Sequence, residues 1–397
     1  MGVGRLIVSM LTLLALSPAA AVAGPTLLFE AGSGKVLYAE DQDHYWHPAS
    51  LTKIMTAYVA FEAIREGRIT PETKLVCSET ASKEPPSKIG LPVGAEMTVA
   101  LGLKALIVKS ANDVAVMLAE TIGGNVDGFV QKMNATARKL GMSRTHFVNP
   151  NGLPAPEQVT TARDLAKLAR AVIRDYPEYA ELWAMPVVQI GKMKLASHNS
   201  LLRTFEGADG LKTGFICDSG FNVVASATRD GTRLMAVVLG EPTPNERALR
   251  AASLLEHGFQ HYGWKNFFNT TDLDSLPMSI PDKGVMSVRQ SVLSWDCGYR
   301  PQKAAARILT LKSRAARAKQ RQKAKQDGKQ EATATGAAPA KASATAPSSA
   351  KPAAASAATV TKAKPGGSPT RPAAGNAAAP GKAKAAAAGP EQGVAKP

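Results

Sequence analysis

The sequence predicts an α+β domain that is followed by a long unstructured tail. Strand-like and helix-like segments alternate between residues 24 and 265, with short turns between them. Hydrophobic residues make up 45% of the 397 residues, which is enough to build a substantial core. After residue 300 the chain has no Phe, Trp or Tyr, and 33 of its last 97 residues are Ala. Such a segment buries too little apolar surface to offset its ordering entropy, so we expect residues 301–397 to be disordered.

The positive charge of the chain is concentrated in the same tail. The formal charge is +16 overall, but residues 301–397 hold 18 Lys and Arg against three acidic residues. The remaining 30 basic and 29 acidic residues leave the body nearly neutral. A folded nucleic-acid-binding domain would carry the basic excess on its own surface, so we expect no nucleic-acid partner. The composition also excludes collagen-like, disulfide-framework and multi-span membrane proteins.

The first 23 residues have the pattern of a secretory signal peptide. Arg5 precedes an apolar run from Leu6 to Leu16, and Ala21-Val22-Ala23 forms a small-x-small cleavage site. An uncleaved membrane anchor is the alternative, but the run is short for a hydrocarbon core of about 30 Å. We therefore expect cleavage before Gly24 and export to the periplasm or cell envelope.

The elements of the body follow from hydrophobic period and turn residues. Segments 26–30 and 35–39 are apolar runs joined by Ala31-Gly32-Ser33-Gly34, which indicates a β-hairpin. Segments 221–227 and 234–240 form a second pair of strands around the turn Arg229-Asp230-Gly231. Helical periodicity predicts helices over the ranges 50–65, 99–108, 114–122, 161–173 and 246–262.

Three short motifs occur in order along this body. They are Ser50-Leu51-Thr52-Lys53, Ser110-Ala111-Asn112 and Lys212-Thr213-Gly214. Each motif alone is weak, because Ser and Lys are common residues. Their order, and their placement at a helix start, between two helices and on a strand, together form a strong pattern.

The first motif places a lysine beside a serine hydroxyl. Residues three apart lie on the same helix face, so Lys53 can bring its amine next to Ser50. The hydroxyl becomes a nucleophile only when a base takes its proton, and a lysine serves as a base when burial or nearby positive charge lowers its pKa. Lys212 would supply such a charge and would attract an anionic substrate. Taken without the other motifs, Ser50 is better interpreted as a helix N-cap and Lys53 as a solvated side chain.

The three motifs together resemble the signature of the penicillin-recognising serine enzymes. The residues that flank the motifs narrow the resemblance to one group within this class. They are Pro48-Ala49, Ile54-Met55-Thr56, Asp113 and Asp209-Gly210-Leu211. They are similar to those of low-molecular-weight penicillin-binding proteins that act as D-alanyl-D-alanine carboxypeptidases. The resemblance covers about residues 25–265. It implies a β-lactamase/transpeptidase-like α/β sandwich, with a central antiparallel sheet flanked by helices.

The resemblance also implies a role for each motif residue. Ser50 would be the acylated nucleophile, Lys53 its base, and Ser110 the proton relay to the leaving D-alanine. Asn112 would hold the substrate amide, while Lys212 and Thr213 would bind the terminal carboxylate. The backbone N–H groups of Ser50 and Phe215 would form the oxyanion hole. Gly214 would let a substrate strand approach the backbone closely.

The implied substrate is a peptidoglycan stem peptide that ends in D-Ala-D-Ala, and β-lactam antibiotics would be covalent inhibitors. The sequence implies no cofactor and no metal. His257 and His261 are four residues apart but lack a partnering carboxylate motif, so we interpret them as helix-surface histidines. The role of His198 is open.

The motifs leave three other functions open. A DD-endopeptidase would perform the same reaction with a larger leaving group. A β-lactamase would need a further base; Glu157, Glu178 and Glu181 are present, but none lies in the Glu-x-Glu-Leu-Asn setting of such enzymes. A non-catalytic wall-binding protein would act through the basic tail, but it would not require three intact motifs.

Residues 266–300 form a short C-terminal extension between the catalytic domain and the tail. They are too few for the β-rich second domain that follows in many relatives. Export would expose the three cysteines to an oxidising compartment, so we hypothesise that Cys217 pairs with Cys297 and ties the extension to the body. The net charge of +15 on the tail favours an anionic envelope polymer or a membrane surface as its partner, and a solvated linker is the alternative.

Overall fold

The computed structural model describes residues 24–268, 271–279 and 284–298. The predicted signal peptide, residues 1–23, and the predicted disordered tail, residues 301–397, lie outside the described residues. The described residues belong to one unit. Its strands are β1 (Thr26–Glu30), β2 (Val36–Glu40), β3 (Lys74–Val76), β4 (Glu96–Thr98), β5 (Val187–Ile190), β6 (Met193–Ala196), β7 (Ala208–Ile216), β8 (Gly220–Arg229) and β9 (Thr232–Glu241). Its α-helices are α1 (Thr52–Arg65), α2 (Glu79–Lys83), α3 (Val99–Lys104), α4 (Asn112–Gly123), α5 (Val126–Lys139), α6 (Ala162–Asp175), α7 (Ala180–Ala184), α8 (Leu201–Thr204) and α9 (Pro244–Phe268).

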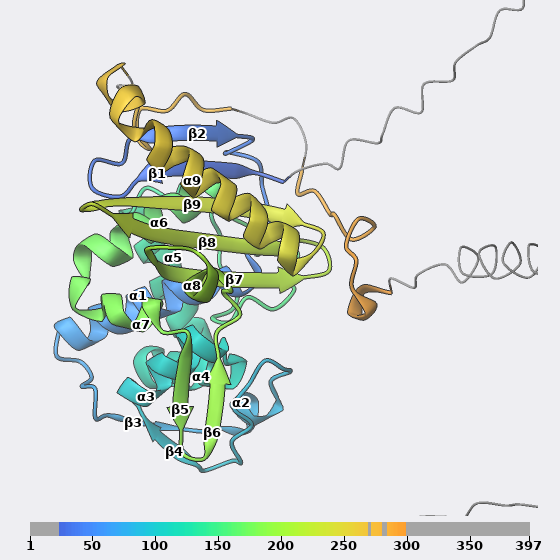
Figure 1. Cartoon of the computed structure of the whole chain (residues 1–397). Helices are drawn as coiled ribbons and strands as arrows, with labels where there is room; N and C mark the ends of the chain where they lie inside the picture. Colours follow the sequence, from blue (N-terminus) through green and yellow to red (C-terminus); the bar gives the residue numbers. More distant parts are fainter. Residues whose placement is uncertain (1–23, 269–270, 280–283, 299–397) are drawn as a thin grey trace, which may run out of the picture. The chain divides into compact units, whose positions relative to one another are not determined.

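A five-stranded antiparallel sheet lies at the centre of this unit, in the order β2-β1-β9-β8-β7 (Figure 1). Both predicted strand pairs are present, as β1–β2 and β8–β9. The β8–β9 turn has positive φ at Asp230 (48°) and Gly231 (75°), which is the conformation that suits a two-residue hairpin loop. The sheet with helices around it confirms the predicted α+β class.

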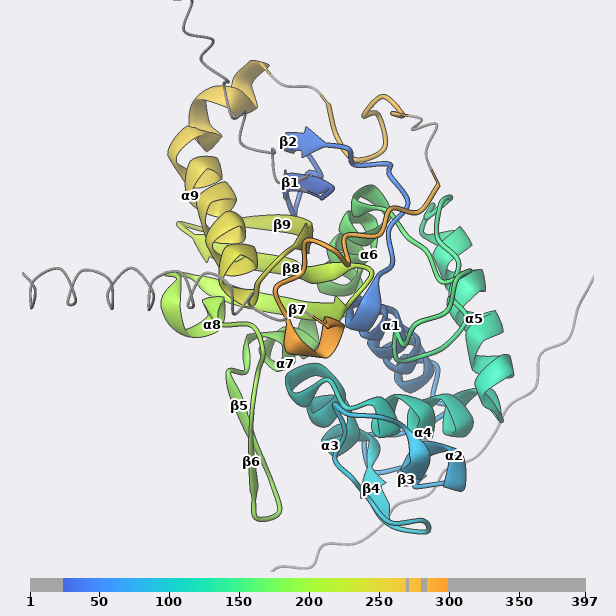
Figure 2. The same ribbon diagram turned by 90° about the vertical axis from the view of Figure 1, so that its right-hand side faces the viewer.

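Helices cover both faces of the sheet, with α9 on one face and α6 on the other (Figure 2). Successive side chains of β1 point to opposite faces of the sheet. Leu28 packs in a hydrophobic cluster with Ala251 and Leu255 of α9, while Leu27 and Phe29 pack in the larger hydrophobic core on the other face. A strand alternates its side chains between the two faces, so a strand covered on both sides is apolar at every position. No helix within the described part of the chain is both long and apolar enough to cross a membrane.

Helix α1 lies inside the protein, where it packs against α4, α5 and α6. Eleven of its 14 residues are buried, so the helix is covered all round rather than on one face. It follows the short 3₁₀ segment η1 (Ala49–Leu51). The predicted nucleophile motif therefore lies at the entrance to the core, with Lys53 completely buried.

The predicted C-terminal extension packs along the body. Helix α9 runs to Phe268, three residues beyond the predicted domain boundary. Residues 271–279 are held by Arg163, which pairs with Asp43 at 2.7 Å in a buried ion pair and donates to the Leu276 carbonyl at 2.7 Å. These contacts make residues 271–279 part of the folded unit.

The last described segment, residues 284–298, crosses the loops at one end of the sheet. Val288 is buried, and its N–H donates to the Asp218 carbonyl at 3.0 Å. Cys217 and Cys297 form a disulfide with their Cα atoms 5.4 Å apart, which confirms the hypothesised pairing. Cys77 is a free, buried thiol.

Candidate active site

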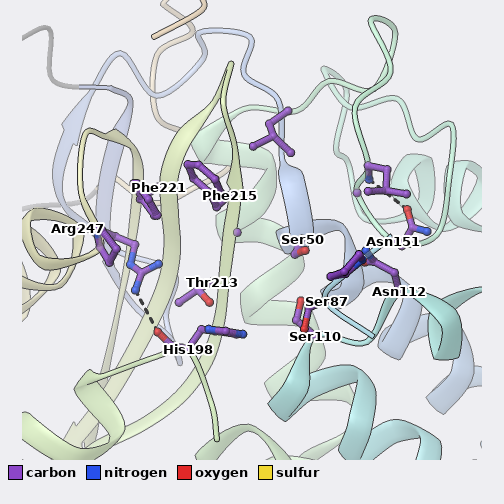
Figure 3. Close-up of a pocket in the computed structure, with 16 residues that line it drawn as sticks. Ser50, Ser87, Ser110, Asn112, Asn151, His198, Thr213, Phe215, Phe221 and Arg247 are labelled. Carbon is purple, nitrogen blue, oxygen red and sulfur yellow. Dashed lines mark hydrogen bonds between the residues drawn. The ribbon is translucent and has the colours of Figure 1, made fainter. Parts of the chain in front are cut away.

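One cleft brings all three motifs together (Figure 3). It encloses about 320 Å³ and has Ser50, Ser87, Ser110, Asn112 and Asn151 along one wall. Thr213, Phe215, Phe221, His198 and Arg247 form the facing wall. The other lining residues are Pro86, Gly152, Leu153, Gly214, Ile216 and Pro244. The predicted site residues that do not line the cleft, Lys53 and Lys212, are buried at 0% and 3% exposure.

Lys53 donates toward Ser50 from the first turn of α1. Its Nζ lies 3.0 Å from Ser50 Oγ and 2.7 Å from Asn112 Oδ1, and it also donates to the Asn151 carbonyl. Burial lowers the pKa of Lys53 well below its ordinary value, and the charge of Lys212 lowers it further. These contacts rule out the alternative in which Lys53 is a solvated helix residue. Ser50 is likewise not an N-cap, because its side chain caps neither η1 nor α1.

The second motif lies where one helix ends and the next begins. Residues Ala105–Lys109 form a single π-helical turn, and Ser110 follows in the left-handed conformation with φ 64°. A π-helical turn and a left-handed residue other than glycine are both uncommon, and both concentrate at functional sites. The change of direction lets Ser110 reach the cleft while Asn112 starts α4.

The loop of residues 85–90 holds Asn112 in place. Asn112 donates to the Pro85 carbonyl through Nδ2 at 2.8 Å and to the Ser87 carbonyl through its N–H at 2.8 Å. Asp113 accepts from the N–H groups of Ile89 and Gly90 at 2.8 to 3.1 Å. With Nδ2 donating to Pro85, the Asn112 carbonyl oxygen is directed at Lys53.

Strand β7 carries the third motif at the edge of the sheet. Burial and the nearby Arg247 lower the pKa of Lys212 to about 7. A Cβ built on Gly214 would lie 2.9 Å from the Pro48 carbonyl and 3.1 Å from Ser50 N. Only glycine lets β7 run this close to the nucleophile loop. Phe215 stacks on Phe221, with ring centroids 4.1 Å apart, and makes this end of the cleft apolar.

Gly152 fills a similar role on the other side of the nucleophile loop. Its φ is 86°, and a Cβ there would overlap the Ala49 carbonyl. The turn of residues 149–152 can therefore press against η1. This contact brings the Asn151 carbonyl to Lys53.

Two basic residues of the facing wall are absent from the predicted site. Arg247 is only 6% exposed, and its Nη2 donates to the His198 carbonyl at 3.1 Å. Burial lowers the pKa of Arg247 to about 10. Burial and the charges of Lys212, Lys109 and Arg247 lower the pKa of His198. One sequence signal points to Arg247: a cation in the first turn of a helix opposes the helix dipole, which is unfavourable without another role.

Glu84 was also missing from the prediction. It follows α2 and accepts a hydrogen bond from Asn151 Nδ2 at 2.9 Å. No sequence motif links it to Lys53, because Asn151 forms the link only in the folded protein. Glu157, Glu178 and Glu181, the candidate bases of the β-lactamase alternative, are exposed and do not line the cleft. Within the described residues, no group of three or more His, Cys, Asp or Glu is placed to hold a metal.

The chain is similar to known D-alanyl-D-alanine carboxypeptidases. The family model described as D-alanyl-D-alanine carboxypeptidase, peptidase S11, matches residues 14–243. D-alanyl-D-alanine carboxypeptidase DacA of Haemophilus influenzae is 38% identical over 242 residues, which are 59% of this chain and 61% of that protein. DacC of Escherichia coli is 36% identical over 247 residues, 59% of this chain and 61% of that protein. The chain thus spans about three fifths of the length of these curated relatives.

Solved structures agree with this similarity. Penicillin-binding protein 5 of Haemophilus influenzae matches with a TM-score of 0.59 and 36% identity, over 62% of this chain and 73% of that one. Penicillin-binding protein D2 of Listeria monocytogenes, in its cefotaxime-bound form, matches with a TM-score of 0.55 and 33% identity, over 60% of this chain and 97% of that one. Since the family model spans more than half of the chain, the protein belongs to the D-alanyl-D-alanine carboxypeptidase family of serine peptidases, as its three motifs predict.

Proposed function

We propose that this protein is a serine D-alanyl-D-alanine carboxypeptidase that trims the terminal D-alanine from peptidoglycan stem peptides. One observation carries the proposal: a fully buried lysine of lowered pKa donates a hydrogen bond to a serine that opens onto a cleft. A buried lysine whose amine is hydrogen-bonded to neutral groups is costly to keep, so its place beside Ser50 calls for a chemical role. Membership of the family supports the same activity.

In the proposed acylation step, neutral Lys53 takes the proton of Ser50 as Oγ attacks the carbonyl carbon of the D-Ala-D-Ala bond. The N–H groups of Ser50 and Phe215 stabilise the negative charge on the carbonyl oxygen. Ser110 relays the proton taken up by Lys53 to the nitrogen of the leaving D-alanine while the C–N bond breaks, so that Lys53 is neutral again and Ser110 keeps its hydroxyl. Water then attacks the Ser50 ester, releases the shortened peptide and restores the hydroxyl.

The basic wall of the cleft suits the carboxylate end of the substrate. Thr213 and Arg247 line this wall, and the buried Lys212 donates to the Thr213 carbonyl at 3.0 Å. We assign Lys212 and Thr213 to the terminal carboxylate, with the positive charge of Arg247 assisting. Asn112 is assigned to the amide of the substrate, because it lines the cleft on the same wall as Ser50.

We propose that β-lactam antibiotics acylate the same serine. Their strained amide resembles the D-Ala-D-Ala bond, and the Listeria relative has been solved in cefotaxime-bound and ampicillin-bound forms. A DD-endopeptidase would use the same groups on a larger leaving peptide. A β-lactamase is disfavoured, because its three candidate bases do not line the cleft.

We further propose that the protein is exported and works in the periplasm or cell envelope. The predicted signal peptide supports this location, and so does the disulfide between Cys217 and Cys297, since disulfides persist in oxidising compartments. The basic tail would then meet anionic envelope polymers or membrane surfaces. Export predicts an N-terminus at Gly24 in the mature protein, and tethering predicts that deletion of residues 301–397 weakens envelope association at low salt.

The proposed activity is tested by intact-mass analysis of the purified protein with penicillin, beside Ser50→Ala, followed by an assay of D-alanine release from a pentapeptide. We expect one stable adduct on the wild type, none on the variant, and D-alanine release only by the wild type. Release from a cross-linked dimer in preference to the pentapeptide would favour an endopeptidase. Rapid turnover of penicillin without a lasting adduct would indicate a β-lactamase. If no adduct forms and no peptide is cleaved, the wall-binding alternative stands.

A further inference from the structure

Glu84 is an acidic side chain close to Lys53 that the proposed mechanism leaves without a role. It follows α2, is half-buried, and does not line the cleft. Its Oε2 accepts from Asn151 Nδ2 at 2.9 Å, and Asn151 is 2% exposed. The backbone carbonyl of the same Asn151 accepts a hydrogen bond from Lys53 Nζ. A continuous set of contacts therefore joins Glu84 to Asn151, Lys53 and the Ser50 hydroxyl.

The hydrogen bonds of Asn151 fix the orientation of its side-chain amide. Its Nδ2 donates to Glu84, and its Oδ1 accepts from the N–H of Leu153 at 3.1 Å. The next residue, Gly152, packs against the nucleophile loop. Glu84 thus anchors a turn whose carbonyl oxygen must stay directed at the Lys53 amine.

Four ionisable groups act on one another around Lys53. Burial and then Lys212 from β7 lower the pKa of Lys53, while Glu84 and Asp113 from α4 raise it. Burial raises the pKa of Glu84 itself; the hydrogen bond from Asn151 and the charges of Lys53 and Lys88 lower it, and Asp113 raises it. Asp113 is already occupied by three backbone N–H groups. Glu84 is the carboxylate that reaches Lys53 through a single intervening residue.

We propose that Glu84 is a positioning residue for the acylation of Ser50: through Asn151 it orients the carbonyl that accepts from Lys53, and it holds a negative charge one residue away from the amine. This inference rests on the proposed function, in which Lys53 is the base. Glu84 opposes the charge of Lys212 and so keeps Lys53 a stronger base than burial alone would allow. A stronger base transfers the Ser50 proton more readily, at the cost of being neutral over a narrower range of pH.

The test compares two substitutions that separate the hydrogen bond from the charge. Glu84→Gln keeps an oxygen that accepts from Asn151 but removes the charge, while Glu84→Ala removes both. Glu79→Gln is the matched control, because Glu79 is an exposed glutamate of neighbouring α2 that pairs with Lys83. The first readout is the rate of Ser50 acylation by a fluorescent penicillin as a function of pH.

We expect Glu84→Ala to slow acylation about tenfold, because a loosened carbonyl leaves the amine less well placed. The acylation rate of Glu84→Gln at its optimal pH should stay within about twofold of that of the wild type. The acid limb of its pH–rate profile should move to lower pH by about half a pH unit, because Lys53 loses the nearby negative charge. Glu79→Gln should match the wild type in both respects. The double variant Asn151→Ala/Glu84→Ala should be acylated no more slowly than Asn151→Ala alone. If Glu84 acts only through Asn151, the effects of the two substitutions do not add.

A second readout does not depend on activity. Lysine labelled with ¹³C at Cε allows Lys53 to be titrated by NMR, and Lys53→Arg identifies its signal. The Lys53 titration should move to lower pH in Glu84→Gln and stay unchanged in Glu79→Gln. If it moves but penicillin never acylates the wild type, the link to Lys53 holds and the proposed function fails. If the wild type is acylated and Glu84→Gln changes neither the titration nor the acid limb, the proposal is overturned.

Discussion

Lys53 Nζ lies 2.7 Å from Asn112 Oδ1, although 59 residues separate the two in the sequence. The contact joins the first motif to the second inside the core. The amide oxygen of Asn112 accepts one N–H of the Lys53 amine and brings no charge. An amide oxygen therefore orients Lys53 while leaving its pKa low. A carboxylate at the same place would favour the charged amine.

The first prediction follows from this contact. Asn112→Asp places an acid against Lys53, which should raise the pKa of the amine and move the acid limb of Ser50 acylation to higher pH by about one pH unit or more. Asn112→Ala is the control, since it also loses the bond to Pro85 but brings no charge. The measurement is the pH dependence of acylation by a fluorescent penicillin. Equal acid limbs in the two variants would contradict the role given to this contact.

Lys212 gives a prediction about stability. Its pKa is about 7 in the folded protein against 10.5 ordinarily, so between these values the unfolded chain binds more protons. Stability therefore rises with pH over this range, and below pH 7 the buried charge carries its full cost. Lys212→Met should be more stable than the wild type at about pH 6, by about 2 kcal/mol or more, while losing activity.

The gain should shrink as the pH approaches about 10, which urea unfolding at several pH values can measure. Lys192→Met is a suitable control, because Lys192 is exposed in the turn between β5 and β6. A gain in stability that stays constant with pH would mean that packing, and not charge, accounts for it.

Arg247 gives a prediction about substrate binding. Arg247→Gln removes a buried cation from the wall assigned to the terminal carboxylate, so KM for the pentapeptide should rise about tenfold with kcat changed far less. The same loss should raise the pKa of Lys212, because Arg247 lowers it. Lys212 then stays charged to higher pH, and the alkaline limb of kcat/KM should move upward. Arg203→Gln, a change of an exposed arginine on α8, should alter neither quantity.

The disulfide gives a prediction that is separate from catalysis. Cys217 and Cys297 are 80 residues apart, and a cross-link over such a distance stabilises a protein by about 4 to 5 kcal/mol, mainly by restricting the unfolded chain. Cys297→Ser should lower the free energy of unfolding by about this amount. Wild type treated with a thiol reductant should unfold like the variant. No difference between oxidised and reduced wild type would show that residues 284–298 contribute by packing alone.

Local patterns account for most of the predicted fold. The β1–β2 hairpin and the cap of α6 were both predictable, because the signals lie within a few residues of each other; Thr161 does accept from Asp164 N–H. Helix α5 carries a readable signal as well, since Phe129, Met133 and Ala137 repeat at helical spacing, yet no element was predicted there. The β5–β6 hairpin is harder, because its two four-residue strands alternate polar and apolar residues only briefly.

The residues of the site also fall into those that a local sequence pattern can predict and those that it cannot. Residues inside the motifs, such as Ser50 and Thr213, can be found by their spacing in the sequence. Arg247, Glu84 and Asn151 have no such spacing, because they reach the site through α9, the end of α2 and the turn before Gly152. Their part depends on tertiary contacts, which a local pattern does not contain.

The bond between Cys217 and Cys297 also makes a closed covalent ring of the chain between them, and this ring contains β8, β9 and α9. A protease that cuts once inside the ring would leave both pieces attached to each other. Such a nicked molecule would keep its full mass on a non-reducing gel and separate into two fragments only after reduction. A single backbone cleavage within this ring therefore does not separate β8, β9 or the helix that carries Arg247 from the rest of the molecule.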